Sequence, residues 1–287
     1  METLSRSWSL LGQSFAVLKS DKELMWLPVI SAIFCLMATV TIFGTGLIWV
    51  LPPGVGLSVP GDPVAQKELG RQMAPFLFLF YIVTYSVSTY FNVALVSIAS
   101  NRLAGGNAKL NDGLQIAWER KWSIFQWALL SATVGMVIQA LEQKSGFLGR
   151  VVIRIIGAAW VLASFFVVQL LAAENMGPVE ALSKSGRIFR KTWGEQVTGG
   201  FSFGLVFFLL ALPGALLPMM GARMGQMQLF AGLAVAVIYW LVLGVINSAA
   251  RGIFVAALYR YATTEQISAG FHRYDMTGAW QPKTPRY

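Results

Sequence analysis

Long apolar runs without any charged side chain dominate the chain. Asp, Glu, Lys and Arg are absent from six stretches that together make up just over half of the sequence: residues 25–50, 72–101, 122–141, 155–173, 196–222 and 224–250. An α-helix needs about 20 apolar residues to cross a hydrocarbon core of about 30 Å. A charged side chain at the centre of the bilayer costs about 2.5–3.5 kcal/mol, which explains why each stretch excludes charge. The pattern therefore predicts six membrane-spanning segments.

The apolar runs are continuous, as at residues 76–80 and 205–210. Strands of a membrane barrel instead alternate apolar with polar residues over about 9–11 positions. Helices pair all their backbone groups within one segment, as a hydrocarbon solvent requires. The expected fold class is an all-α, polytopic transmembrane bundle. We expect a single membrane domain over residues 1–260 and a cytoplasmic C-terminal tail over residues 261–287.

Short amphipathic segments precede the first, third and fifth predicted spans. Their apolar residues recur at spacings of three and four, and each segment ends in cations and tryptophan. We expect these segments to form interfacial elbow helices, with the apolar stripe in the headgroup boundary and the cations at lipid phosphates. The predicted interfacial anchors are Trp8, Trp118, Trp193, Arg187, Arg190 and Lys191.

The elbows divide the chain into three similar units of one elbow and two spans. The units cover residues 1–103, 104–175 and 176–260. Because each unit crosses the membrane twice, the three units would have parallel orientation, which favours a pseudo-threefold repeat about an axis along the membrane normal. The alternative is that amphipathic helices precede spans wherever positive residues are favoured, without any repeat.

Composition agrees with a membrane solvent and sets the orientation. Hydrophobic residues make up 56% of the chain and charged residues 12%, which excludes a disordered chain and an ordinary soluble globule. Most of the 22 Lys and Arg residues fall on the side that holds both termini, so the positive-inside rule predicts cytoplasmic termini. The net charge of +9 then indicates attraction to anionic lipid headgroups and no nucleic-acid partner.

Residues that carry catalytic chemistry are scarce. The chain has one histidine, His272, and one cysteine, Cys35, and it lacks a phosphate-binding loop. A Ser–His pair, a zinc site built on two histidines and a nucleotide-driven pump all lack necessary parts. We therefore expect a protein that is not an enzyme and has no cofactor and no metal.

Polar residues within or bordering the spans are the candidate binding positions. In the second span Thr84, Ser88 and Asn92 follow at intervals of four and form one polar stripe on the helix. The full candidate polar seam is Thr84, Ser88, Asn92, Gln169, Glu174, Asn247 and Arg251. The structural alternative is that these residues only form hydrogen bonds between helices. Pro213 and Gly214 predict a break in the fifth span, because proline removes a backbone donor.

Several segments resemble an uncharacterised prokaryotic family of six-span integral membrane proteins, a domain of unknown function. They are Ser7-Trp8, Asp21-Lys22-Glu23-Leu24, Tyr90-Phe91-Asn92-Val93-Ala94-Leu95, Gly157-Ala158-Ala159-Trp160, Gly177-Pro178-Val179-Glu180-Ala181 and Arg190-Lys191-Thr192-Trp193-Gly194. The resemblance implies a prokaryotic cytoplasmic (inner) membrane protein and implies no activity. Gln169 departs from the pattern, since a proline is expected there, so the resemblance does not support a kink in the fourth span.

Two functional interpretations remain open. The first is a membrane scaffold, assembly or lipid-interacting protein, favoured because coupled carriers usually need an intramembrane charge and the spans hold none. Its expected partners are anionic lipids and either a second copy of the chain or a partner membrane subunit. The alternative is a channel- or carrier-type conduit for a small solute or lipid, and an intramembrane enzyme comes third. A conduit predicts a polar cavity that reaches Ser88 or Asn92, whereas tight packing there would count against it.

Overall fold

The protein is all-α in the residues that the computed structural model describes: 21–50, 63–193 and 198–264, with residues 12, 14–16, 18–19 and 266. The elements are η1 (Lys22–Met25), α2 (Trp26–Val50), α3 (Pro63–Leu103), α4 (Leu110–Glu119), α5 (Lys121–Lys144), α6 (Phe147–Ala163), α7 (Val167–Ala173), α8 (Pro178–Trp193), α9 (Thr198–Met224) and α10 (Gln226–Thr264). Six helical segments are long and apolar enough to cross a membrane. The predicted all-α, six-span fold class is therefore confirmed.

Large apolar side chains cover the outside of these helices. Trp49 near the end of α2 is 84% exposed and Met227 at the start of α10 is 83% exposed. Water would strongly disfavour so much contiguous apolar surface, whereas acyl chains accommodate it. The exposed apolar surface supports a hydrocarbon environment independently of the charge-free sequence windows.

Helix α3 is the centre of the molecule and packs against α2, α4, α5, α7 and α10. The main core lies at one end of the molecule, where the last turns of α3 meet α7 and the C-terminal part of α10. Its largest fully buried side chains include Leu95, Ile98, Phe166 and Ile253. Glycine permits the close approaches in this core: a Cβ placed on Gly113 of α4 would lie 2.6 Å from the carbonyl oxygen of Ala94.

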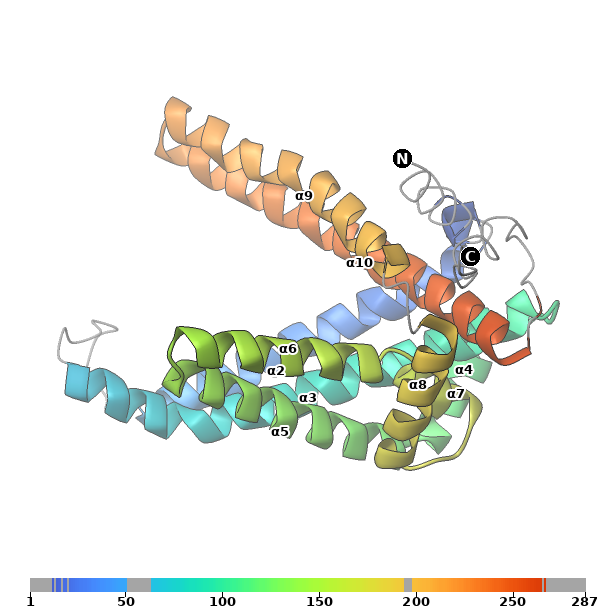
Figure 1. Ribbon diagram of the computed structural model, residues 1–287. Helices are drawn as coiled ribbons and strands as arrows, with labels where there is room; N and C mark the ends of the chain where they lie inside the picture. The colour runs from blue at the N-terminus through green and yellow to red at the C-terminus, as the bar shows by residue number, and fades with distance from the viewer. Residues whose placement is uncertain are drawn as a thin grey trace, which may run out of the picture.

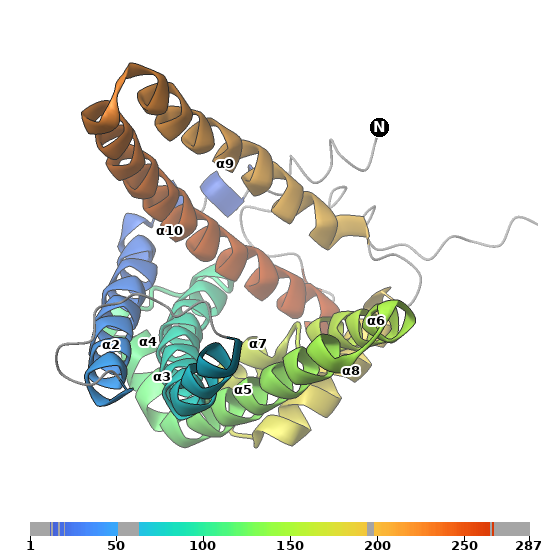
Figure 2. The same cartoon turned by 90° about the vertical axis from the view of Figure 1, so that its left-hand side faces the viewer.

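The helical hairpin α9–α10 diverges from the remaining spans, so the molecule has two arms (Figures 1 and 2). One arm is this hairpin, and the other contains α2, α3, α5 and α6. The hairpin turns at Gly225, whose φ of +133° is a conformation that side-chain-bearing residues rarely adopt. Its two helices touch closely, since a Cβ on Gly232 would lie 2.7 Å from the carbonyl oxygen of Leu217. The arms join where α10 crosses α3.

Helix α9 is continuous through Pro213 and Pro218, in contrast to the break expected at Pro213 and Gly214. Side chains of α10 bind the backbone carbonyls beside this proline. Tyr239 Oη donates to Leu210 O at 2.5 Å, and Trp240 Nε1 donates to Ala211 O at 3.0 Å. A neighbouring helix thus supplies donors where proline disturbs the backbone hydrogen bonds, which is how membrane helices tolerate proline.

The fourth span is interrupted, although its sequence holds no charge, proline or glycine near the break. Helix α6 ends at Ala163, and α7 begins at Val167 after a short turn. The backbone N–H of Phe166 in this turn donates to Ser185 Oγ of α8 at 3.0 Å, and both residues are fully buried. A side chain from a later helix therefore stabilises the interruption, and the sequence of the span itself gives no sign of it.

Helices α4 and α8 occupy the segments predicted as the second and third elbows, and Trp118 on α4 is exposed. Among the positions of α8 whose burial is described, Ala181 and Ser185 are buried, whereas the apolar Val179 is exposed. Helix α8 is therefore packed against α6 and α7 as well as being amphipathic. The interfacial position of the elbows, the threefold repeat and the domain boundaries stay predictions. Trp8 and most of the predicted tail lie outside the described residues, as do the side chains of Lys191 and Trp193.

Candidate functional site

Two cavities lie where the arms join, on either side of the contact between α3 and α10. The first, which we call the inner cavity, has a volume of about 350 Å³ and is bounded by α2, α3 and α10. The second, the junction cavity, has a volume of about 400 Å³ and is bounded by α3, the α6–α7 turn region and α10. Asn92 of α3 and Ser248 of α10 line both cavities. Two polar residues at the helix contact are therefore common to the linings of both spaces.

The structure brings five of the seven predicted seam residues to these cavities. Ser88 lines the inner cavity, Asn92 lines both, and Gln169, Asn247 and Arg251 line the junction cavity. These residues come from α3, α7 and α10, which are far apart in the sequence. Ser248 adds a hydroxyl group, and Ser164 adds another that sequence reasoning did not select. Isolated serines in apolar spans carry too weak a signal to be chosen without their neighbours.

The other two seam residues lie elsewhere, which corrects their expected place. Thr84 Oγ1 donates to Phe80 O of its own helix at 2.6 Å, so its hydroxyl is used locally. Glu174 follows α7 and accepts two hydrogen bonds from Lys184 Nζ, at 2.5 and 2.6 Å. Tyr259 Oη of α10 also donates to Glu174 Oε1, at 3.4 Å. Glu174 thus joins three helices at the end of the core and does not line either cavity.

Gln169 is the most enclosed polar side chain of the junction cavity. It is 5% exposed, and its Oε1 atom is buried without a hydrogen-bond partner among the residues that the structure describes. An unsatisfied buried acceptor of this kind costs about 1–3 kcal/mol. Native structures contain few such atoms, and an unpaired one beside a cavity is typical of a position that a ligand or water completes.

Arg251 supplies the charge of the junction cavity. Among the described residues that line this cavity it is the one ionisable side chain, and none of them is acidic. The described part of the chain gives Arg251 no ion pair with a carboxylate. The cavity therefore combines one cation with the amides of Asn92, Gln169 and Asn247, an arrangement that favours an anionic group with polar substituents.

The inner cavity is less polar. Cys35 Sγ lies 3.6 Å from Ser88 Oγ and 3.9 Å from Thr84 O, so the single thiol hydrogen-bonds within the α2–α3 contact. Phe91, Trp240 and Leu241 form apolar walls. Among the described residues no group of three or more His, Cys, Asp or Glu side chains lies together as a metal site, and His272 lies outside them. This cavity suits an apolar chain better than a charged group.

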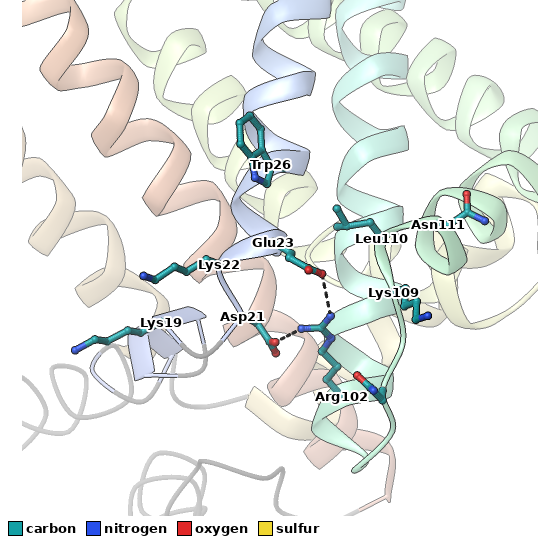
Figure 3. A pocket seen from close by; sticks show the side chains of 10 residues that line it. Lys19, Asp21, Lys22, Glu23, Trp26, Arg102, Lys109, Leu110 and Asn111 are labelled. Atoms are coloured by element: carbon teal, nitrogen blue, oxygen red, sulfur yellow. Dashed lines mark ion pairs between the residues drawn. The ribbon is translucent and has the colours of Figure 1, made fainter.

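A third recess lies at the end of the molecule where α2 begins and α3 ends (Figure 3). It has a volume of about 880 Å³, and Lys19, Lys22 and Lys109 contribute cations to its lining. Arg102 forms ion pairs with Asp21 and, at 3.7 Å, with Glu23, while its Nε donates to Ala108 O at 3.0 Å. From the sequence these charges indicate orientation, an elbow and a family resemblance. Their pairing does not follow from the sequence, because the partners are remote in the chain. The recess therefore contains the ion pairs of Arg102 and the exposed indole of Trp26. Its three lysines form no ion pair among the described residues.

Comparison with known proteins leads to a family and to no assigned activity. No curated protein matches the chain. A family model described as a family of unknown function, DUF6159, matches residues 72–271. The matched region includes most of α3 and all of α4 to α10, and hence every residue that lines the junction cavity. The chain therefore belongs to the DUF6159 family of unknown function, and its six long apolar helices are those of a multi-pass membrane protein.

Proposed function

We propose that the protein is a lipid-interacting membrane protein, without enzymatic activity, that holds a phospholipid between its two arms. The observation that carries this proposal is the position of the inner and junction cavities at the point where the arms diverge. A space between diverging transmembrane helices is open sideways to the bilayer. Lipid can therefore enter it without crossing water.

The chemistry of the lining matches the two parts of a lipid. The inner cavity offers the apolar walls of Phe91, Trp240 and Leu241, which suit an acyl chain. The adjoining junction cavity offers Arg251 and amide groups, which suit a polar headgroup. Because Asn92 and Ser248 line both spaces, one molecule can occupy the two cavities together.

The charge distribution supports an orientation with both termini in the cytoplasm of a prokaryotic inner membrane. The ion pairs of Arg102 with Asp21 and of Lys184 with Glu174 lie at the end of the molecule where α2 starts and where α3 and α7 end. Lys19, Lys22 and Lys109 lie at this same end, around the recess. Excess cations favour the cytoplasmic side and its anionic lipids. A scaffold role, with a second copy of the chain or another membrane subunit on the apolar arms, agrees with the same arrangement.

A conduit for a small solute is the second candidate, because the cavities reach both Ser88 and Asn92. This is the position at which a conduit requires a cavity. The spans do not, however, surround one central axis, since the α9–α10 hairpin diverges from the others (Figure 2). A sideways-open space favours lipid over a water-soluble solute.

Photo-crosslinking tests the lipid proposal directly. The full chain is reconstituted in vesicles that contain a phospholipid with a photoreactive acyl chain, and labelled peptides are identified by mass spectrometry. We expect labelling of residues that line the inner cavity. The variant Leu241→Trp should fill this cavity and reduce that labelling severalfold.

The control for this experiment is Leu216→Trp on α9, because Leu216 is 56% exposed and Leu241 is 58% exposed. Leu216 does not line the inner cavity, so its substitution should leave labelling unchanged. Equal labelling of the two variants would contradict the lipid proposal. A different result would favour the conduit: a small polar solute leaks from the vesicles, Leu241→Trp blocks this leakage, and lipid labelling is unchanged.

A further inference from the structure

We propose that the junction cavity binds the headgroup of a glycerophospholipid, with the phosphate at Arg251 and a hydroxyl or ammonium donor of the headgroup at Gln169 Oε1. This inference rests on the proposed lipid-binding function and specifies its chemistry. It depends on two groups that line the same cavity: Gln169 Oε1, which has no hydrogen-bond partner among the described residues, and Arg251, which has no ion pair among them. Each group requires a different part of the headgroup.

Gln169 defines the donor requirement. Its side chain is 5% exposed and lines the junction cavity from α7, and its carbonyl oxygen has no hydrogen-bond partner in the described structure. A carbonyl oxygen only accepts, so the complementary ligand atom must carry hydrogen. Glycerol and ethanolamine headgroups provide O–H or N–H donors. A choline headgroup provides none, because its nitrogen is fully methylated.

Arg251 defines the charge requirement. Guanidinium presents donors in a planar fork that matches the oxygen atoms of phosphate. In the described lining of the junction cavity no carboxylate neutralises Arg251, so the lining has a net positive charge. Asn92, Asn247 and Ser248 add further donors and acceptors around it. A single phosphate diester therefore fits this charge balance.

Position and size agree with a headgroup drawn in from the membrane surface. Asn92 lies ten residues before Arg102 on α3, which corresponds to about 15 Å along the helix axis. The cavity volume of about 400 Å³ falls in the range of about 300–1,000 Å³ for small-ligand sites. Two acyl chains do not fit in such a space together with the headgroup. The adjoining inner cavity and the apolar arms receive them.

Native mass spectrometry of the full chain in detergent tests the inference. The probes are short-chain phosphatidylglycerol, phosphatidylethanolamine and phosphatidylcholine, together with glycerol 3-phosphate and inorganic phosphate as soluble sources of the same group. We expect the glycerol and ethanolamine lipids to bind about three- to tenfold more tightly than the choline lipid, as expected for one additional hydrogen bond. The soluble phosphates should bind at least tenfold more weakly than the lipids.

Five variants, two of them controls, separate the two requirements. Gln169→Leu should abolish the preference over choline while keeping lipid binding, and Gln226→Leu at the exposed start of α10 should keep the preference. Arg251→Gln should lower the affinity for all three lipids at least tenfold. Arg251→Lys should retain part of the affinity, since the positive charge remains. Arg223→Gln, which removes a cation near the hairpin turn, should change nothing. Thermal unfolding of each variant identifies any loss that comes from misfolding.

Specific results would overturn the inference. Equal binding of the three lipids to the unaltered chain, or an unchanged preference in Gln169→Leu, would remove the donor assignment. Undiminished lipid binding by Arg251→Gln would refute the assignment of the phosphate to Arg251. Binding of glycerol 3-phosphate as tight as that of the lipids would show that the cavity recognises a soluble phosphate and not a lipid. If headgroup preference is absent but Leu241→Trp still blocks crosslinking, this inference fails and the lipid-binding function stands. If no lipid labels the inner cavity, the proposed function itself fails.

Discussion

The guanidinium group of Arg102, at the end of α3, forms an ion pair with the carboxylate of Asp21, just before α2. The same guanidinium group contacts Glu23 and donates to the backbone at Ala108. One side chain that is 14% exposed therefore connects the segment before the first span, the end of the second span and the loop that leads to α4. This end of the molecule holds most of the buried core.

Arg102→Gln should destabilise the fold, because it leaves two carboxylates without their partner and removes a backbone contact. We expect a loss of about 1–3 kcal/mol, seen as a lower midpoint of thermal unfolding in detergent. The control is Arg154→Gln: Arg154 also forms an ion pair, with Glu142 at 2.8 Å, but its side chain is 72% exposed. An exposed pair contributes little, so this midpoint should barely move. Equal shifts in the two variants would refute a special role for Arg102.

Ser185→Ala should destabilise the interrupted fourth span. The substitution leaves the buried N–H of Phe166 without its acceptor, at a cost of about 1–3 kcal/mol. Ser183→Ala on the exposed side of the same helix is the matched control and should have no effect. Hydrogen exchange should also show faster exchange of the Phe166 amide in the first variant alone. Unchanged exchange there would argue against the Ser185 contact.

Gly232→Ala should disturb the α9–α10 hairpin, because the added methyl group would meet the Leu217 carbonyl at 2.7 Å. Gly244→Ala on the same helix meets no atom within 4 Å and is the matched control. We expect a lower unfolding midpoint for the first variant and an unchanged or slightly higher one for the second, since alanine favours helix. If both variants behaved alike, the close packing of the hairpin would be disproved.

Cysteine labelling tests the predicted orientation in the membrane. In a Cys35→Ala background, Gln226→Cys places a thiol beside the hairpin turn, and Thr264→Cys places one at the end of α10. A membrane-impermeant maleimide added to intact cells should label residue 226 and spare residue 264 until the cells are opened. The reverse result would contradict cytoplasmic termini.

Charge exclusion predicted the spans well, because the cost of a buried charge acts on each segment by itself. The windows over residues 25–50 and 224–250 coincide closely with parts of α2 and α10. Interactions between segments were the part that the sequence did not reveal. The carbonyls beside Pro213 find donors on Tyr239 and Trp240 of another helix, and the interruption before Val167 depends on Ser185.

The candidate site shows the same division. Ser88, Asn92, Gln169, Asn247 and Arg251 could be selected because polar groups within apolar spans are expensive and few. Their convergence on shared cavities could not be derived, since helix periodicity gives the face of a helix and not the neighbour of that face. Glu174 lies away from the cavities for this reason: it pairs with Lys184 of another helix, a contact that helix periodicity does not reveal.

Helix α10 is continuous from Gln226 to Thr264, so one helix belongs both to the α9–α10 hairpin and to the core. Helix α10 crosses α3 at Gly252, where an added Cβ would meet the side chain of Leu95. About 36 Å of helix separates Met227 from Arg251, against about 12 Å between Arg251 and Tyr259, at 1.5 Å per residue. A change in bilayer thickness would tilt the longer part of α10, between Met227 and this crossing. The shorter part beyond Gly252 would then move the Tyr259–Glu174 contact by a smaller amount, whereas Arg251, next to Gly252, would stay almost in place.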